Sequence, residues 1–225
     1  MTARPRAAIS WSGGKDCCSA LLRVADRYEV AAALTMFDEE GTRSRSHGLR
    51  PELVAAQVAL LGVEHVRRHT SWDAYTEAFE SGLGEIAERG ITHVIFGDIM
   101  FESHRHWTEQ RCAAVGLTAV QPIWGEPTER IAREFLASGS EAMIVTARAQ
   151  FLDHTWLGRT LTPAMLDEFT TLGVDPCGEL GEYHTLVVNC PRFSRPLDVR
   201  SCGHVLRGGC WALDLQLTHR DATHE

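Results

Sequence analysis

The sequence predicts an α/β protein built on a parallel sheet, with a smaller C-terminal portion of mixed α and β character. Short apolar runs alternate with helical patterns over roughly the first two-thirds of the 225 residues. A glycine-rich turn separates the first apolar run from the first helical pattern, and the alternation ends near residue 147. We therefore expect two domains, residues 1–147 and residues 148–225.

The apolar runs of the first part have the length of buried strands, and helical patterns separate them. Strands are expected at residues 7–11, 30–37, 63–68, 92–97, 118–124 and 142–146. Helices are expected at residues 17–27, 51–61, 73–89, 103–115 and 128–137. Pro51 supports the second helix, because proline favours the first helical position. Strands spaced in this way form βαβ units, which build a parallel sheet covered on both faces.

The remaining segments are less regular. Residues 38–48 are polar and lack periodicity, which indicates a long loop that could close over a ligand. The C-terminal portion contains one helical pattern and two short β-like runs, at residues 163–172, 185–189 and 210–217. Gly208 and Gly209 stand directly before the last run and predict a hairpin turn between strands.

Composition and charge exclude several classes of protein. No apolar run approaches the ~20 residues that a membrane span needs, and residues 1–6 do not begin a signal peptide. The seven cysteines form no Cys-x-x-Cys pair, so neither disulfides nor zinc are expected and a reducing cytoplasm fits best. The net charge is -8, and Arg67-Arg68 is the only adjacent basic pair, which argues against a nucleic-acid surface.

The glycine turn contains the single lysine of the chain. All but one of the 22 basic residues are arginine, and the exception is Lys15, in the run Ser12-Gly13-Gly14-Lys15-Asp16-Cys17. A glycine turn lets backbone N–H groups converge on an anion, and the helix N-terminus adds positive charge. A lysine kept in an arginine-rich chain indicates a phosphate contact that needs a compact ammonium. The alternative is an ordinary tight turn in which Asp16 caps the helix.

Ser-Gly-Gly-Lys-Asp after a first strand resembles the PP-loop of the N-type ATP pyrophosphatases, which cleave ATP to AMP and pyrophosphate. Further blocks resemble the diphthine–ammonia ligase family, in the family's order and over nearly the whole chain. They lie at residues 34–40, 46–50, 96–98 and 173–185, the last reading Gly-Val-Asp-Pro-Cys-Gly-Glu-Leu-Gly-Glu-Tyr-His-Thr. The resemblance implies the Rossmann-like adenine nucleotide alpha-hydrolase fold with strand order 3-2-1-4-5. Where the family usually has Ser or Thr, this chain has Cys17, whose thiol is a poorer hydrogen-bond donor.

The resemblance implies ATP bound at the carboxyl edge of the sheet. In the implied strand order, the first and fourth strands are neighbours, so Asp98 would face the glycine loop. His47 and Arg50 lie in the long loop at the same edge, where adenine and ribose would bind. The expected ATP-binding residues are Ser12, Gly13, Gly14, Lys15, Asp16, Cys17, His47 and Gly97. The candidate Mg²⁺ ligands are Asp16 and Asp98.

The block at residues 175–185 is the implied acceptor side. Its glycines indicate close backbone approach, and its two glutamates, Glu179 and Glu182, suit a cation, an amine or magnesium. Four residues, Asp98, Glu102, Arg105 and Glu109, share one helical face, either bordering the cleft or forming a solvated face with internal ion pairs. The predicted catalytic residues are Lys15, Asp98, Glu179 and Glu182. The predicted substrate residues are Glu102, Arg105, Gly178 and His184.

Together these features predict an ATP-dependent amide ligase. A substrate carboxylate would displace pyrophosphate from ATP, and ammonia would convert the acyl-adenylate to an amide with release of AMP. The partners are ATP, ammonia and a carboxylate-bearing small molecule or modified protein side chain; a homodimer is left open. Cys17 is given no covalent role, because the chemistry needs no nucleophilic side chain. The alternatives are a PP-loop tRNA-modifying enzyme and a non-catalytic ATP-binding module.

Overall fold

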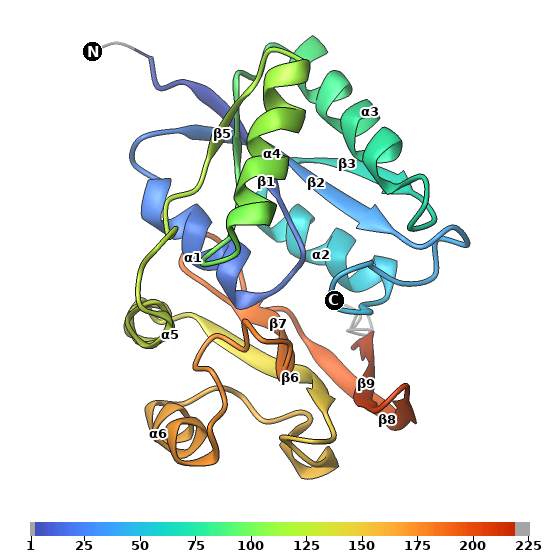
Figure 1. The fold of residues 1–225 in the computed structure, drawn as a ribbon, viewed down its shortest axis with the longest axis vertical. Helices are drawn as coiled ribbons and strands as arrows, with labels where there is room; N and C mark the ends of the chain where they lie inside the picture. The colour runs from blue at the N-terminus through green and yellow to red at the C-terminus, as the bar shows by residue number, and fades with distance from the viewer. Residues whose placement is uncertain (1–2, 219–225) are drawn as a thin grey trace, which may run out of the picture.

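The chain forms two β-sheets, one parallel and one antiparallel (Figure 1). The computed structural model describes residues 3–218. The first sheet is parallel, with its strands in the order β3-β2-β1-β4-β5. Its strands are β1 (Arg6–Ser10), β2 (Glu29–Phe37), β3 (Glu64–His69), β4 (His93–Ile95) and β5 (Thr118–Val120). The predicted fold class and strand order are therefore confirmed.

Helices cover both faces of the parallel sheet because its strands are apolar on both sides. On β1, Ala7 and Ile9 point into one buried cluster while Ala8 points into another, as the alternation of a strand requires. The first cluster includes α1 (Lys15–Val24) and α2 (Pro51–Leu61). The second includes α3 (Tyr75–Glu88) and α4 (Glu102–Ala114), which lie side by side in Figure 1. None of the helices among residues 3–218 is long and apolar enough to cross a membrane.

The second sheet is antiparallel and has the order β7-β6-β9-β8. It consists of β6 (Glu141–Arg148), β7 (Tyr183–Asn189), β8 (Val199–Arg207) and β9 (Cys210–Leu217). Two helices, α5 (Thr128–Ala137) and α6 (Pro163–Leu172), and a 3-10 turn, η1 (His154–Trp156), accompany it. Buried side chains of the second sheet and its helices, such as Leu186 on β7 and Phe169 on α6, belong to the same cluster as Ile9. One core therefore joins the α1 face of the first sheet to the second sheet.

The position of β6 corrects one prediction. We expected residues 142–146 to continue the series of βαβ units, but β6 pairs antiparallel with β7 and β9. An apolar run shows that a strand is buried, but it does not show which sheet completes its hydrogen bonds. The predicted domain division after residue 147 stays a prediction, and the pairing of β6 argues for placing it earlier, before α5.

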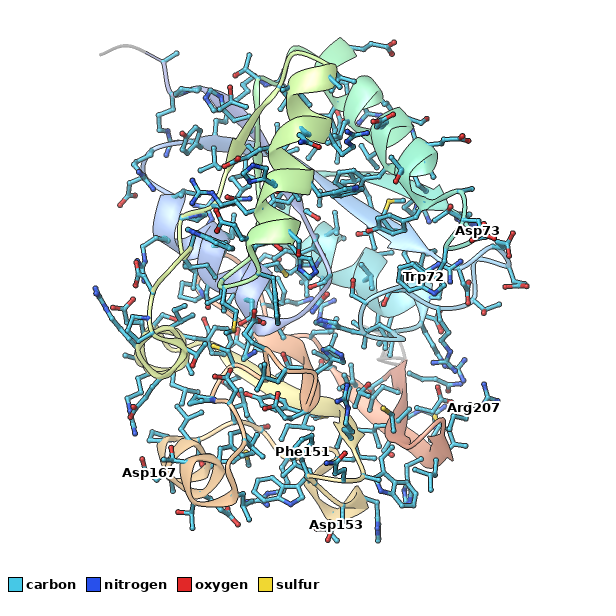
Figure 2. All side chains as sticks on the ribbon, viewed as in Figure 1. Trp72, Asp73, Phe151, Asp153, Asp167 and Arg207 are labelled. Atoms are coloured by element: carbon cyan, nitrogen blue, oxygen red, sulfur yellow. The ribbon has the colours of Figure 1, made fainter. Side chains whose placement is uncertain are left out.

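The hairpin predicted at Gly208 and Gly209 is confirmed, and it reveals a strand that the pattern did not mark. Both glycines have positive φ, 53° and 78°, and they connect β8 to β9, with Arg207 opposite Cys210. A two-residue turn with positive φ at both positions favours glycine. Most of β8 is exposed, so its sequence lacks the apolar signature of a buried strand. Arg207 marks the tip of this hairpin in Figure 2.

Candidate functional site

The glycine loop lies at the carboxyl edge of the parallel sheet, between β1 and α1, and neighbouring elements fix its backbone. Gly13 has a φ of 87°, and a side chain there would meet Gln57 Oε1 at 2.7 Å. The carbonyl of Gly13 accepts hydrogen bonds from Gln57 Nε2 at 3.0 Å and from the amide of Val187 at 2.8 Å. Because Val187 belongs to β7, the second sheet helps to hold the loop.

Gly14 and Gly97 allow two close approaches to the loop. A Cβ atom on Gly14 would lie 2.1 Å from Cε1 of His47. A Cβ atom on Gly97 would lie 2.7 Å from the backbone nitrogen of Cys17 and equally close to the carbonyl carbon of Asp16. The end of β4 therefore touches the first turn of α1, as expected for neighbouring strands. Gly97 lets the backbones meet, and His47 covers Gly14.

Lys15 is buried, with 3% of its surface exposed. Its Nζ donates a hydrogen bond to Asp16 Oδ2 at 2.9 Å and another to the carbonyl of Cys177, and it lies 5.2 Å from the centre of the Tyr183 ring. Burial is the largest single influence on Lys15 and lowers its pKa, but the charge and hydrogen bond of Asp16, together with Tyr183 and Cys177, raise the pKa well above its usual value. A permanent positive charge thus lies between the glycine loop and the loop at residues 175–182.

The thiol of Cys17 is buried inside the glycine loop. Ser12 Oγ donates to Cys17 Sγ at 3.4 Å, and Sγ donates to the carbonyl of Gly14 at 3.1 Å. Burial raises the pKa of Cys17, so the thiol stays neutral near pH 7. These contacts give Cys17 and Ser12 a structural place in the loop and leave no activated thiolate there.

Two adjoining cavities open beside the loop. The larger, about 650 Å³, extends between α3 and α4, and the smaller, about 190 Å³, lies between the loop and residues 177–185. Aromatic rings form one wall of the larger cavity: Trp72, Tyr75, Phe79, Phe96 and Trp107. Of these, Trp72 lies in the exposed loop before α3 (Figure 2). The residues that line both cavities are Asp16, His47, Gly97, Asp98 and His104.

Three carboxylates face the smaller cavity: those of Asp16, Asp98 and Glu179. Burial, reinforced by the charge of Asp16, raises the pKa of Glu179 to about 7, and burial also raises the pKa of Asp98. Asp16 Oδ1 is buried and has no hydrogen-bond partner among residues 3–218. Within that range, no three His, Cys, Asp or Glu side chains form a ready metal cluster. Asp16 and Asp98 could therefore supply only part of a metal shell.

Glu182 differs from Glu179. Glu182 is 1% exposed. It is not among the described residues that line either cavity. Its Oε1 accepts a hydrogen bond from the amide of Asp175 at 3.0 Å, while Asp175 Oδ1 accepts from the amides of Cys177 at 2.8 Å and Glu179 at 3.2 Å. Glu182 and Asp175 therefore shape the loop that presents Cys177 to Lys15. The structure does not bring Glu182 to the other predicted catalytic groups.

His47 and His184 stack at the junction of the cavities. Their ring centres are 4.8 Å apart, and His47 Nδ1 lies 2.9 Å from the carbonyl of Thr185. Burial lowers the pKa of His47 to about 4 and that of His184 to about 3, so both rings are neutral near pH 7. Gly178 lines the smaller cavity with a φ of 70°, and a Cβ there would meet the carbonyl of Tyr183 at 2.7 Å.

The structure separates Glu102 and Arg105 from the site. The helix α4 begins at Glu102, so Asp98 lies before the helix. Neither Glu102 nor Arg105 is among the described residues that line the two cavities. Arg105 Nε pairs with Glu109 Oε1 at 2.9 Å, and its guanidinium lies over the ring of Trp124. Arg105 and Glu109 therefore fit the alternative interpretation of this helical face, a solvated surface with an internal ion pair.

Sequence reasoning missed several residues that build the site. Thr185 Oγ1 accepts a hydrogen bond from the amide of Lys15 at 3.1 Å. Gln57, a fully buried polar residue, binds both Gly13 and Val187 through Nε2. A polar residue within the apolar stripe of α2 was the available signal for Gln57. The aromatic wall carried no separate signal, because such residues at helical spacing usually form core.

These features define an α/β nucleotide-binding protein of the PP-loop type. Comparison with protein families agrees: the diphthamide synthase N-terminal domain matches residues 5–119, and the diphthamide synthase C-terminal domain matches residues 127–215. The chain belongs to the diphthamide synthase family. The resemblance stated from the motifs is thereby confirmed, as is the expected class, an ATP-dependent carbon–nitrogen ligase.

Curated relatives carry the name diphthine–ammonia ligase. The protein from Schizosaccharomyces pombe is 29% identical over 210 residues, which are 82% of this chain and 34% of that protein. The Mus musculus protein is 26% identical over 89% of this chain and 85% of its own length, and the Homo sapiens protein is 26% identical over 87% and 83%. This chain thus spans about a third of the yeast relative. A solved Methanocaldococcus jannaschii structure, described as a predicted subunit of tRNA methyltransferase, aligns with a TM-score of 0.42 and 14% identity over 83% of this chain and 98% of that one.

Proposed function

We propose that this chain adenylates a carboxylate with ATP and then transfers the acyl group to ammonia, forming an amide. One observation carries the proposal: Lys15 Nζ binds both Asp16 in the glycine loop and the carbonyl of Cys177 in the opposite loop. A phosphate site and an acceptor site are therefore built around one ammonium. The names of the curated relatives support the same reaction class.

The larger cavity is the place for ATP. Its volume of about 650 Å³ falls within the range of small-molecule sites, and it runs from Ser12 and Cys17 to the aromatic wall. Adenine would stack on rings such as Tyr75 and Trp107. The triphosphate would then lie against the glycine loop, where the N-terminus of α1 adds positive charge. The α-phosphate would lie at the wall shared with the smaller cavity.

Asp16 and Asp98 are the side chains that would hold Mg²⁺. They fit this role because Asp16 Oδ1 is buried without a hydrogen-bond partner in the described chain and Asp98 faces the same cavity. Mg²⁺ usually takes one or two carboxylates and completes its shell with phosphate oxygens and water. When bound, it would supply charge neutralisation at the phosphates.

The smaller cavity would receive the acceptor carboxylate and ammonia. In the first step a carboxylate oxygen bonds to the α-phosphorus, and the bond from that phosphorus to pyrophosphate breaks; Lys15 stabilises the charge that departs. In the second step ammonium gives one proton to Glu179. The resulting ammonia attacks the acyl carbon, AMP leaves with the electron pair of the broken C–O bond, and the nitrogen releases its second proton to water. A pKa of about 7 suits Glu179 to this exchange.

The test uses the whole chain with ATP, Mg²⁺ and ammonium, offered a protein bearing diphthine and, separately, a pool of small carboxylates. We expect AMP and pyrophosphate in equal amounts together with one amide per AMP, and no amide without ammonium. ADP and phosphate as products would contradict the mechanism. ATP binding without turnover on any acceptor would favour the binding module, and stimulation by tRNA alone would favour the tRNA enzyme. The seven free thiols suit a reducing compartment, and we propose the cytoplasm.

A further inference from the structure

A carboxylate on the second sheet binds two arginines of the loop at residues 38–50. Asp214 Oδ1 accepts from Arg50 Nε at 2.9 Å and from an Arg43 guanidinium nitrogen at 3.0 Å. Asp214 Oδ2 accepts from a second guanidinium nitrogen of Arg50 at 2.6 Å. The Arg50 pair is bidentate, which fixes orientation as well as distance. Arg50 was predicted near adenine, but the structure assigns its guanidinium to β9.

The same loop carries His47, the residue that covers the glycine loop. The His47 ring occupies the space that a Gly14 side chain would need, and it lines both cavities. Around it, the loop is folded by its own hydrogen bonds, including those from the amides of Thr42 and Arg43 to Asp38 Oδ1 at 2.6 Å and 3.1 Å. It is therefore a formed element, and its attachment to the second sheet sets where His47 lies.

Three attachments join this loop to the second sheet. Two are made by His47: its Nδ1 lies 2.9 Å from the carbonyl of Thr185 on β7, and its backbone carbonyl accepts a hydrogen bond from Thr146 Oγ1 on β6 at 3.5 Å. The third is the Asp214 pair on β9. The His47 ring contact is inside the site, whereas Asp214 lines neither cavity among the described residues. We propose that Asp214 is a positioning residue that holds the 38–50 loop, and with it His47, over the ATP-binding glycine loop.

This inference rests on the proposed ATP site, and it predicts an effect on nucleotide binding without any contact to nucleotide. Asp214→Ala should leave Arg43 and Arg50 without their shared partner, so the loop would open more often. Only the closed loop encloses ATP in this proposal. The apparent affinity for ATP therefore falls in proportion to the fraction of molecules in which the loop is closed. We expect the dissociation constant for ATP to rise roughly twofold to fivefold, the size of one partly exposed charge pair.

The experiment compares wild type, Asp214→Ala, Asp214→Glu, Arg50→Ala and the double variant Arg50→Ala/Asp214→Ala. ATP affinity is measured by calorimetry, and cleavage by trypsin after Arg43 and Arg45, each followed by serine, is tracked by mass spectrometry without ATP. We expect faster cleavage and weaker ATP binding in both alanine variants, recovery in Asp214→Glu, and no further loss in the double variant, since both changes remove one interaction.

Glu85→Ala is the matched control. Glu85 also joins two arginines, Arg68 and Arg89, each at 2.5 Å, but it does so on α3 beside β3. It should leave ATP affinity and cleavage in the 38–50 loop unchanged. Equal losses in Glu85→Ala, or unchanged cleavage in Asp214→Ala, would overturn the inference. If wild type bound no ATP, the proposed function would fail, and the cleavage rates would still decide whether Asp214 holds the loop.

Discussion

The ammonium of Lys15 donates a hydrogen bond to the carbonyl of Cys177, 162 residues further along the chain. The carbonyl is aimed by Asp175, whose side chain accepts from the amide of Cys177 and from Thr128 Oγ1 at the start of α5. Lys15 thus joins the glycine loop to the acceptor loop, and Asp175 joins the acceptor loop to α5. Lys15 binds this carbonyl and, in the proposed mechanism, also contacts phosphate. We therefore expect another cation to substitute poorly for Lys15.

Lys15→Arg should lose at least about 100-fold in AMP formation, of the order reported for loss of one charge-stabilising donor. The space around Nζ is enclosed by Asp16, Cys177 and the Tyr183 ring, and a planar guanidinium is larger and less able to follow a departing phosphate. The rate of AMP release measures the loss of activity, and a thermal melt measures separately whether the fold is kept. Turnover near that of wild type would show that the position needs only positive charge.

The two glutamates of the acceptor loop should behave differently. Glu179→Gln should lower amide formation about 100-fold, within the usual contribution of a general base. Its melting temperature at pH 8 should not fall, because the substitution removes a charge that burial disfavours. Glu182→Gln should instead lower the melting temperature, because it alters a carboxylate that is buried and bound to the amide of Asp175.

Rates of amide formation against pH separate proton transfer by Glu179 from a purely structural role. The wild-type rate should rise with pH through about 7, where Glu179 loses its proton, and this limb should be absent in Glu179→Gln. Glu182→Gln should keep the limb even if its rate is lower. A limb retained in Glu179→Gln would assign the titration to another group.

Sequence reasoning reached the parallel sheet, the glycine loop and the nearness of Asp98 to that loop, because they follow from periodicity and from the strand order that the resemblance implies. It could not separate Glu179 from Glu182, which stand three residues apart in the same motif. Their roles depend on which carboxylate the backbone of Asp175 captures, and this is a tertiary contact. The pairing of Asp214 with Arg50 was equally invisible, because the two lie 164 residues apart, one directly before α2 and the other on β9.

Two glycine substitutions should distinguish a contact that a side chain makes with the glycine loop, at Gly14, from a contact between backbones, at Gly97. Gly14→Ala should weaken ATP binding because its Cβ would strike the His47 ring, and His47→Ala in the same chain should relieve that clash. Gly97→Ala meets the backbone of Asp16 and Cys17, so no truncation can relieve it. ATP affinity and melting temperature of these three variants, and of His47→Ala alone, provide the comparison. Failure of His47→Ala to restore any affinity to Gly14→Ala would contradict the proposed packing.

Cys17→Ser should keep at least half of the wild-type rate. Its thiol is neutral and bound to the carbonyl of Gly14, and a hydroxyl can make the same contact while donating more strongly. The rate of AMP formation before and after treatment with a thiol reagent is the measurement, with Cys17→Ala as the control. A collapse of activity in both Cys17→Ser and Cys17→Ala, with the melting temperature unchanged, would revive a covalent role.

The stacked histidines should make the fold sensitive to mild acid. The pKa values of His47 and His184 in the folded chain, about 4 and about 3, lie below the 6.5 of an exposed histidine. The unfolded chain therefore binds more protons between pH 6.5 and 4, and stability is lost as the pH falls through that window, by roughly 3 kcal/mol for His47. Glu179 acts in the opposite direction between about pH 7 and 4.5, which overlaps this window, because its raised pKa favours the folded state as the pH falls. Urea unfolding of wild type and His184→Phe at pH 8, 6 and 4.5 isolates the histidine contribution. His184→Phe keeps an aromatic ring but cannot take a proton, so it should lose less stability than wild type between pH 6 and 4.5, and equal losses would show that the buried ring does not titrate there.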